Sequence, residues 1–171
     1  ITKVLIAEDD PLAGAALASA IERPEYQVVG LAATGTGALE VFHKQRPDII
    51  LMDIQLEEEM DGIETSRRIL ATHNIPVVFV SALEDEKTIN EAKRVTPYGY
   101  ILKPYNPGTV HAAIQIALRL FERDREIALA RRLLADYARK IETVREEERT
   151  RCSRDIHDVL GQKLTAVRMN L

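Results

Sequence analysis

The sequence predicts an α/β fold: a five-stranded parallel sheet of order 2-1-3-4-5 with helices on both faces, followed by a long, dimerising C-terminal helix or coiled coil. Three observations predict it. Short apolar runs alternate with helical segments over residues 1–118. The stretch 48–56 holds a continuous apolar run, typical of a parallel strand buried on both faces. Between Gly108 and Gly161 neither proline nor glycine interrupts the chain.

Five strands and four connecting helices can be placed along the first part of the chain. Pro11 suits the first turn of a helix that follows three acids, and Pro76 suits the first residue of a strand. The predicted strands are residues 3–7, 27–32, 49–53, 77–80 and 98–102, and the predicted helices are residues 12–22, 38–45, 63–72 and 84–94. The strict alternation of strands and helices with short connections predicts a parallel sheet with helices on both faces.

Length and composition restrict the classes of protein that the chain can belong to. A chain of 171 residues holds one well-packed domain and an appendage. No apolar run approaches the roughly 20 residues that span a bilayer, so we expect no membrane contact. The lone Cys152 excludes an internal disulfide and suits a reducing cytosol, which predicts a cytoplasmic protein. Because residue 1 is Ile, we expect a piece of a longer protein.

Charge divides the chain in two. Residues 1–118 hold 10 Lys and Arg against 17 Asp and Glu, whereas residues 119–171 hold 13 against 10. The small positive surplus lies on a stretch of alternating charge, which is typical of a solvated helix face. Nucleic acid is therefore not the expected partner of this segment.

Polar side chains follow four of the predicted strands. They are Glu8, Asp9 and Asp10 after the first strand, Asp53 after the third, Ser81 after the fourth and Lys103 after the fifth. In a sheet of order 2-1-3-4-5 these strand ends meet at the edge where such sheets bind ligands. Clustered carboxylates need a cation, and Mg²⁺ prefers such oxygen ligands. Acids, a metal, an amine and a hydroxyl around Asp53 suit phosphoryl transfer, whereas Asp53 alone could equally be a helix cap.

Residues 1–118 resemble a response-regulator receiver domain along their whole length. The matching residues are Glu8, Asp9, Asp53, Ser81, Tyr100 and the pair Lys103-Pro104. The resemblance implies that Asp53 is the phosphoacceptor and that Ser81 and Tyr100 are switch residues. It also implies that Asp9, Asp53 and the backbone carbonyl of Gln55 ligate Mg²⁺, with Glu8 acting through water, and that a cis peptide bond precedes Pro104. Simple core packing of Tyr100 is compatible with a switch role.

The C-terminal third carries an apolar seam at coiled-coil spacing. Its members are Val110, Ile114, Ala117 and Phe121, then Ile127, Ala130, Leu134, Tyr137, Ile141 and Val144, and finally Cys152, Ile156, Leu160, Leu164, Val167 and Leu171. The phase slips across the charged run 122–126, which marks a stutter or a boundary. A single helix cannot bury such a stripe, so we expect a homodimer, with partial fold-back as the alternative. We divide the segment into a signalling helix, 119–145, and a second helical segment, 146–171.

His157 begins a motif of a different kind. It precedes Asp158 and lies one position off the seam, so its ring should face solvent, and Gln162 lies one turn beyond Asp158. An imidazole next to a carboxylate can attack phosphorus, although a lone exposed histidine would be the simpler interpretation. The His-Asp-x-x-Gly-Gln-x-Leu context resembles the dimerisation and phosphoacceptor helix of histidine kinases related to nitrate-responsive sensors. The resemblance implies that His157 is the phosphoacceptor, Asp158 its general base, and Gln162 a phosphatase residue together with Asp158.

These features predict a part of a cytoplasmic hybrid histidine kinase in two-component phosphorelay signalling. Phosphorylation of Asp53 would change helix pairing around His157, and direct transfer between Asp53 and His157 is a weaker hypothesis. We expect a cognate histidine kinase or response regulator as partner. The ATP-binding domain is expected beyond Leu171, so the chain would not autophosphorylate with ATP. The alternatives are a receiver-coupled RNA-binding antiterminator and a receiver dimer with a purely structural stalk.

Overall fold

The computed structural model describes the backbone of residues 1–56, 60–82 and 86–169; side chains at 86–89, 158–159 and 161–169 lie outside the description. The chain divides into two units, Ile1–Asp124 and Arg125–Leu171. Each unit is described by itself.

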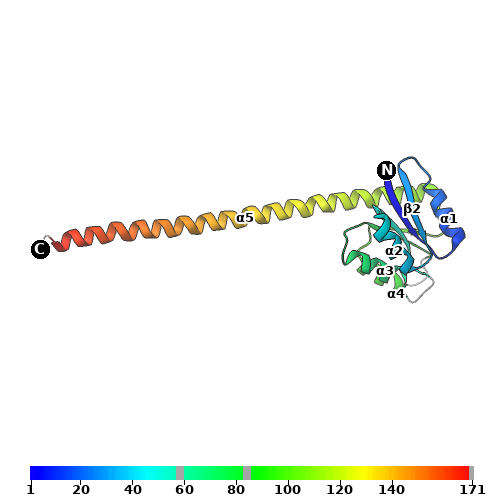
Figure 1. Ribbon diagram of the computed structural model, residues 1–171, viewed down its shortest axis with the longest axis horizontal. Coiled ribbons are helices and arrows are strands. Elements are labelled where there is room, and N and C mark those ends of the chain that lie inside the picture. Colours follow the sequence, from blue (N-terminus) through cyan, green and yellow to red (C-terminus); the bar gives the residue numbers. More distant parts are fainter. Residues whose placement is uncertain (57–59, 83–85, 170–171) are drawn as a thin grey trace. The chain divides into compact units, whose positions relative to one another are not determined.

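The first unit contains the predicted five-stranded sheet (Figure 1). Its strands are β1 (Thr2–Ala7), β2 (Tyr26–Ala32), β3 (Ile49–Asp53), β4 (Val77–Ser81) and β5 (Gly99–Leu102). They lie in the order β2-β1-β3-β4-β5, and every neighbouring pair is parallel. The predicted strand order is confirmed.

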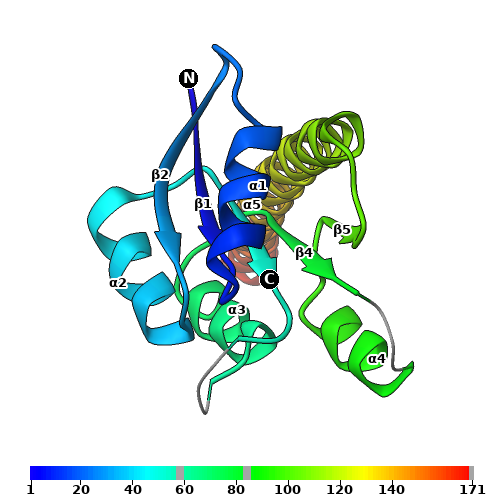
Figure 2. The same cartoon turned by 90° about the vertical axis from the view of Figure 1, so that its right-hand side faces the viewer.

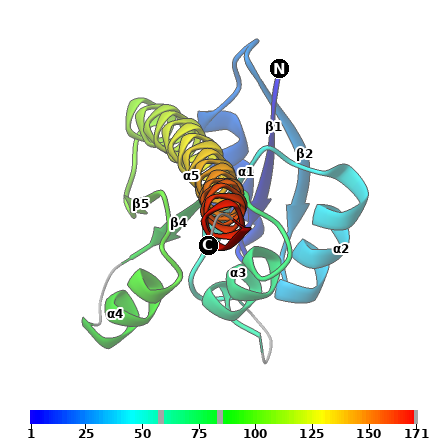
Figure 3. The ribbon, with the colours of Figure 1, turned by 90° about the vertical axis from the view of Figure 1, so that its left-hand side faces the viewer.

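Helices cover both faces of the sheet. They are α1 (Pro11–Ala20), α2 (Gly35–Gln45), α3 (Gly62–Leu70), α4 (Glu86–Arg94) and the first part of α5 (Pro107–Met169). One apolar core joins the sheet to α1 and α5, and a second joins it to α2, α3 and α4 (Figure 2). Figure 3 shows α2 and α3 next to each other, as their mutual contacts require. The predicted helix at 84–94 begins at Glu86, and residues 84 and 85 lie outside the described residues.

The central strand β3 has the environment that its sequence predicts. All five residues from Ile49 to Asp53 are buried, and the strand pairs with β1 on one side and β4 on the other. Side chains alternate between the two cores: Ile49 and Leu51 contact one, Ile50 and Met52 the other. Its last residue, Asp53, is buried, pairs with Val80 of β4 and lies at the carboxyl edge of the sheet.

Capping side chains fix where the helices start. The Asp10 carboxylate accepts hydrogen bonds from the backbone N–H groups of Leu12 (2.8 Å) and Ala13 (3.4 Å). Thr34 caps α2 and Asp61 caps α3 in the same way. Such bonds satisfy N–H groups that have no partner within the helix. Asp10 is therefore occupied as a cap, which separates it from its neighbours Glu8 and Asp9.

Helix α5 continues without interruption through the charged run 122–126, where the sequence predicts a stutter or a boundary. The division between the two units, at Asp124 and Arg125, falls within this run. Within the first unit, Val110, Ile114 and Ala117 are buried in the core. From Glu122 onward, every α5 side chain that the structure describes is exposed. In the second unit the apolar seam therefore has no partner within its own helix, as its spacing predicts.

Gly62 brings the start of α3 close to the end of β3. Its N–H donates to the Ile54 carbonyl at 3.0 Å, and a Cβ at this position would overlap the backbone carbonyl oxygen of Asp53. Gly14 on α1 offers a contrast, because a Cβ there would lie 3.7 Å from Glu8, an ordinary contact distance. The backbone after Asp53 is thus held in place by a residue that cannot carry a side chain.

Substitution of Gly62 should distort this connection. We expect Gly62→Ala to lower the free energy of unfolding by about 1–3 kcal/mol, the cost typical of overpacking. The matched Gly14→Ala should be neutral or stabilising by up to about 1 kcal/mol, because alanine favours the helix. Urea denaturation of both variants measures the difference. Equal stability of the two variants would contradict the close approach at Gly62.

Candidate functional site

Three carboxylates meet at the carboxyl edge of the sheet. Glu8 and Asp9 follow β1, Asp53 ends β3, and each offers an oxygen within 4.8 Å of the others. Glu8 and Asp53 are each 6% exposed, whereas Asp9 is half-buried. The strand order places these residues together, since β1 and β3 are neighbours. Of the predicted set Glu8, Asp9, Asp53 and Lys103, the structure brings all four into one site.

Lys103 connects two of the acids. Its Nζ donates to Asp53 Oδ2 at 2.6 Å and to Glu8 Oε1 at 2.9 Å. Lys103 follows β5, whereas Glu8 follows β1 and Asp53 ends β3. The contact therefore joins strands that are not neighbours in the sheet. A charge-assisted hydrogen bond of this length, with both acids buried, is stronger than a surface ion pair. Lys103 therefore holds Asp53 and Glu8 in one arrangement.

The protonation of the site is set by burial and by these neighbours. The pKa of Glu8 is raised from 4.5 to about 7: burial raises it most, the hydrogen bond from Lys103 partly offsets burial, and the charge of Asp53 adds to the rise. Burial also lowers the pKa of Lys103, but its hydrogen bonds to Asp53 and Glu8 outweigh burial and raise that pKa above its ordinary value. Lys103 stays charged at neutral pH, where Glu8 is near the midpoint of its titration.

The residues of the site fit a divalent cation. Glu8 Oε2 is buried and lies 2.8 Å from Lys103 Nζ, yet among the described residues it accepts no hydrogen bond of good geometry. An acceptor of this kind is costly unless it binds water or a cation. One lysine cannot neutralise three acids. The unmatched negative charge, on oxygen ligands with Asp9 still accessible, suits Mg²⁺ with part of its water shell.

The loop after β3 holds the second oxygen of Asp53. The N–H of Gln55 donates to Asp53 Oδ1 at 3.0 Å, while Lys103 bonds Oδ2. Both carboxylate oxygens are therefore fixed by different partners. Ligation of Mg²⁺ by the Gln55 carbonyl stays a prediction.

Ser81 and Tyr100 lie on neighbouring strands. Ser81 ends β4, is half-buried, and its carbonyl accepts the N–H of Lys103 at 2.9 Å. Tyr100 packs on Phe79 with ring centroids 6.0 Å apart, and its buried hydroxyl has no hydrogen-bond partner among the described residues. Burial raises the pKa of Tyr100. The predicted switch roles of both residues stay predictions, whereas the expected cis peptide bond between Lys103 and Pro104 is present.

His157 belongs to the second unit and is exposed on α5, as its position off the seam predicts. The side chains of Asp158 and Gln162 lie outside the described residues. The predicted roles of all three as phosphoacceptor, general base and phosphatase residue therefore stay predictions.

Two residues, one next to the site and one at the opposite end of β5, were not singled out from the sequence. Gly62 directly follows Asp61 at the start of α3, and an Asp-Gly pair in this position could have indicated the close backbone approach. Tyr98, interpreted only as a strand residue, packs on Phe121 of α5. No local pattern pairs residues so far apart in the sequence.

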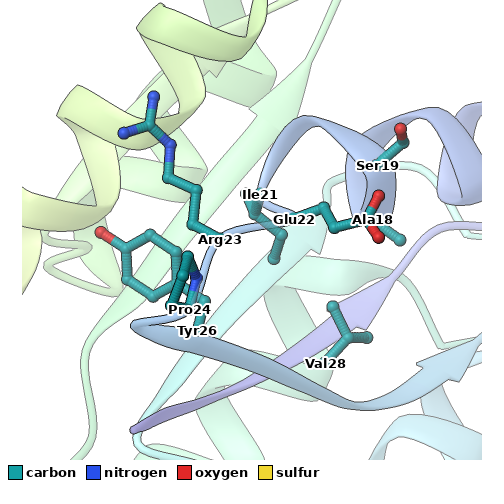
Figure 4. A pocket seen from close by; sticks show the side chains of 8 residues that line it. All are labelled: Ala18, Ser19, Ile21, Glu22, Arg23, Pro24, Tyr26 and Val28. Carbon is teal, nitrogen blue, oxygen red and sulfur yellow. The ribbon is translucent and has the colours of Figure 1, made fainter.

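A separate groove of about 510 Å³ lies at the opposite ends of the strands (Figure 4). It is lined by the end of α1 and the start of β2, including Ile21, Arg23 and Tyr26. Tyr26 makes an edge contact with His111 of α5, with ring centroids 5.5 Å apart. None of the predicted site residues lines this groove.

Comparison with known families agrees with both predicted resemblances. The response regulator receiver domain family matches residues 4–115, and a histidine kinase family matches residues 148–171. The chain belongs to the response regulator receiver domain family. Its first unit is thus a receiver domain of two-component signalling, and its C-terminal segment has the sequence character of a histidine kinase.

Curated relatives include two regulators. The transcriptional regulatory protein PdtaR of Mycobacterium tuberculosis is 29% identical over 149 residues, which cover 87% of this chain and 71% of PdtaR. The phyllosphere-induced regulator PhyR of Methylorubrum extorquens is 36% identical over 118 residues, which cover 68% of this chain and 43% of PhyR. The chain therefore spans less than half of PhyR.

Solved structures confirm the fold. The signal receiver domain of a modulated diguanylate cyclase from Desulfovibrio desulfuricans G20 is 38% identical, with a TM-score of 0.68, covering 72% of this chain and 98% of that one. A chain that contains the yeast Spc42 trimeric coiled coil is 32% identical, with a TM-score of 0.65, covering 80% and 96%. Across the described residues, no helix has the length and apolar character needed to cross a membrane.

The raised pKa of Glu8 predicts a pH-dependent stability. Between pH 4.5 and about 7 the folded protein binds more protons at Glu8 than the unfolded chain, so stability falls as pH rises through this window. Without metal, Glu8→Gln should be more stable than the wild type above the window, by about 1–3 kcal/mol, because it buries no charge.

The advantage of Glu8→Gln should shrink as the pH falls toward 4.5. Urea denaturation in a chelator, at several pH values, measures it. The exposed Glu40 supplies the control, since Glu40→Gln should show no such dependence. If the advantage of Glu8→Gln were constant with pH, Glu8 would be ionised normally in the folded protein.

Proposed function

We propose that the chain is a part of a hybrid histidine kinase, in which Mg²⁺-dependent phosphorylation of Asp53 controls a dimeric phosphoacceptor helix that carries His157. The observation that supports this most directly is the Lys103 bridge between buried Glu8 and Asp53 beside Asp9. The histidine kinase match at 148–171 supports the proposed phosphoacceptor helix.

The proposed reaction is transfer of a phosphoryl group to Asp53. A carboxylate oxygen attacks the phosphorus of a phosphohistidine on a cognate kinase; a P–O bond forms, the P–N bond breaks, and the leaving imidazole takes up a proton. Asp9, Asp53 and Gln55, with Glu8 through water, would hold Mg²⁺, which supplies charge neutralisation at the phosphoryl oxygens.

The protein's own groups provide orientation and further charge. The two hydrogen bonds from Lys103 and Gln55 restrict Asp53 to one rotamer, so little ordering remains for the reaction to require. The ammonium group of Lys103 could move its hydrogen bond from the Asp53 carboxylate to a phosphoryl oxygen as negative charge shifts there. Ser81, on the neighbouring strand end, would donate its hydroxyl to one of those oxygens.

The second unit would receive this signal as a dimer. Its exposed side chains include Leu134 at 67%, Tyr137 at 63% and Ile141 at 56%, all in the seam. Their spacing of three and four residues fits coiled-coil packing with a second copy. Burying the seam in a homodimer removes this apolar surface from water and places two His157 side chains on one assembly.

A second candidate is a transcriptional regulator without kinase activity. Its support is the PdtaR relative, whose name describes a transcriptional regulatory protein and whose match covers 87% of this chain. In the form of an RNA-binding antiterminator, it would bind RNA with an affinity that falls steeply with salt. The histidine kinase match at 148–171 favours the kinase assignment instead.

Substitution of the phosphoacceptor should abolish modification. We expect Asp53→Asn to lose Mg²⁺-dependent phosphorylation by phosphoramidate, because an amide is a poor nucleophile. Intact-protein mass spectrometry measures the covalent product. Asp61→Asn is the matched control: asparagine caps a helix as well as aspartate, so this variant should be labelled like the wild type. Labelling of Asp53→Asn, or labelling of the wild type without metal, would contradict the proposed reaction.

Dimerisation can be tested with the native cysteine. Cys152 is exposed and follows Ile141 by three helical turns on the same face. We expect a bismaleimide to crosslink wild-type chains through Cys152, and sedimentation to give a dimer. Charges in the seam, Leu134→Glu with Ile141→Glu, should weaken association by at least roughly tenfold, because they would bury carboxylates.

Leu129 is the matched control for the seam. It is 60% exposed and apolar but lies on another face of α5, so Leu129→Glu should leave the dimer intact. A monomeric wild-type chain, or equal effects of the seam and control substitutions, would exclude pairing through the seam.

A further inference from the structure

Tyr98 connects the beginning of β5 to the end of α5 within the first unit. Its ring meets Phe121 edge to face, with centroids 5.4 Å apart and planes at 88°. The carboxylate of Asp124 also acts on the Tyr98 hydroxyl, through its charge and a hydrogen bond that both raise the pKa of Tyr98. Asp124 is the last residue of the first unit, so these contacts fix the turn of α5 that directly precedes Arg125. An edge-to-face pair and a bond to a carboxylate together are specific in direction, unlike apolar burial.

The rings of Tyr98 and Phe121 are half-buried, whereas Asp124 is exposed. Burial raises the pKa of Tyr98, and the charge and hydrogen bond of Asp124 raise it further, while Arg123 lowers it. Asp124 also forms an ion pair with Arg123 at 3.1 Å, which orients the carboxylate. From Glu122 onward the described α5 side chains are exposed, so Phe121 and Asp124 lie where core packing of the helix ends.

The other end of β5 leads to the phosphoacceptor. Tyr98 is anchored by its N–H to the Val77 carbonyl at 2.9 Å, and β5 then runs for four residues, Gly99–Leu102, to Lys103. Lys103 in turn bonds Asp53 at 2.6 Å. A fully extended strand of this length has little freedom to absorb a shift along its axis. A change in the position of Lys103 therefore reaches Tyr98 through one short, rigid strand.

We propose that Tyr98, Phe121 and Asp124 form a latch that holds the last turn of α5 in the first unit, and that the latch loosens or tightens when Lys103 changes its partner at Asp53. This rests on the proposed phosphorylation of Asp53. A phosphoryl group would draw Lys103 from the carboxylate toward its oxygens, which moves the end of β5. Phosphorylation of Asp53 would then change the stability of the last helical turn of α5 in the first unit.

Hydrogen exchange of the full chain tests the latch. Without ligand, amide exchange over residues 119–126 should be roughly three- to tenfold faster in Tyr98→Phe than in the wild type, as expected for one lost hydrogen bond. Tyr26→Phe is the matched control, because Tyr26 also contacts α5 through its ring, at His111. It should leave exchange over 119–126 unchanged.

Coupling is tested by adding Mg²⁺ and beryllofluoride, a phosphoryl analogue, with ¹⁹F NMR to measure its binding. In the wild type, exchange over 119–126 should change on binding, and Tyr98→Phe should lose at least half of this change at equal occupancy. Unchanged exchange in Tyr98→Phe, or an equal response in both proteins, would overturn the latch. Binding without any response in the wild type would overturn the latch alone, whereas absence of binding would overturn the proposed function as well.

Discussion

The sharing of Lys103 by two buried carboxylates is the interaction on which the rest of the site depends. Glu8 and Asp53 belong to neighbouring strands, and burying both would be costly without the lysine between them. One cation against three acids leaves the site short of positive charge. The fold maintains this shortage of positive charge, because the buried apolar strands hold the backbone positions from which the acids converge. The proposed binding of a cation and the proposed response to a phosphoryl group would both follow from the same imbalance of charge.

The backbone around Asp53 is determined from both sides. The apolar strand β3 fixes the residue before it, and Gly62 fixes the loop after it. Hydrogen bonds from Gln55 and Lys103 then restrict the side chain. Such restriction costs conformational entropy, but this cost is met on folding and would not add to the barrier of the proposed reaction. The receiver domain thus uses folding free energy to prepare one carboxylate.

Much of this could be predicted from the sequence, because its signals are local. An apolar run ending in Asp53 predicts a buried strand, and polar strand ends predict a shared edge once the strand order is assumed. What could not be predicted depends on distance in the fold. The contact of Tyr98 with Phe121 arises only when the elements pack, whereas the role of Asp10 as a cap depends on residues two and three positions along the chain. The charged run 122–126, a stutter or a boundary by its pattern, contains the division between the two units, but its charges do not reveal that α5 continues through it.

The continuity of α5 has a consequence for how such a chain can vary in length. Ile141 of the seam and His157 lie on one uninterrupted helix, so each residue gained or lost between them turns one about the axis by roughly 100° relative to the other. A flexible connection would not transmit such rotations, whereas in a helix the rotation from each added residue accumulates. Insertions and deletions in this segment should therefore survive only in steps of about seven or eleven residues, which restore the facing of both sites. The number of residues between Ile141 and His157 should therefore be as strongly constrained as the residues themselves.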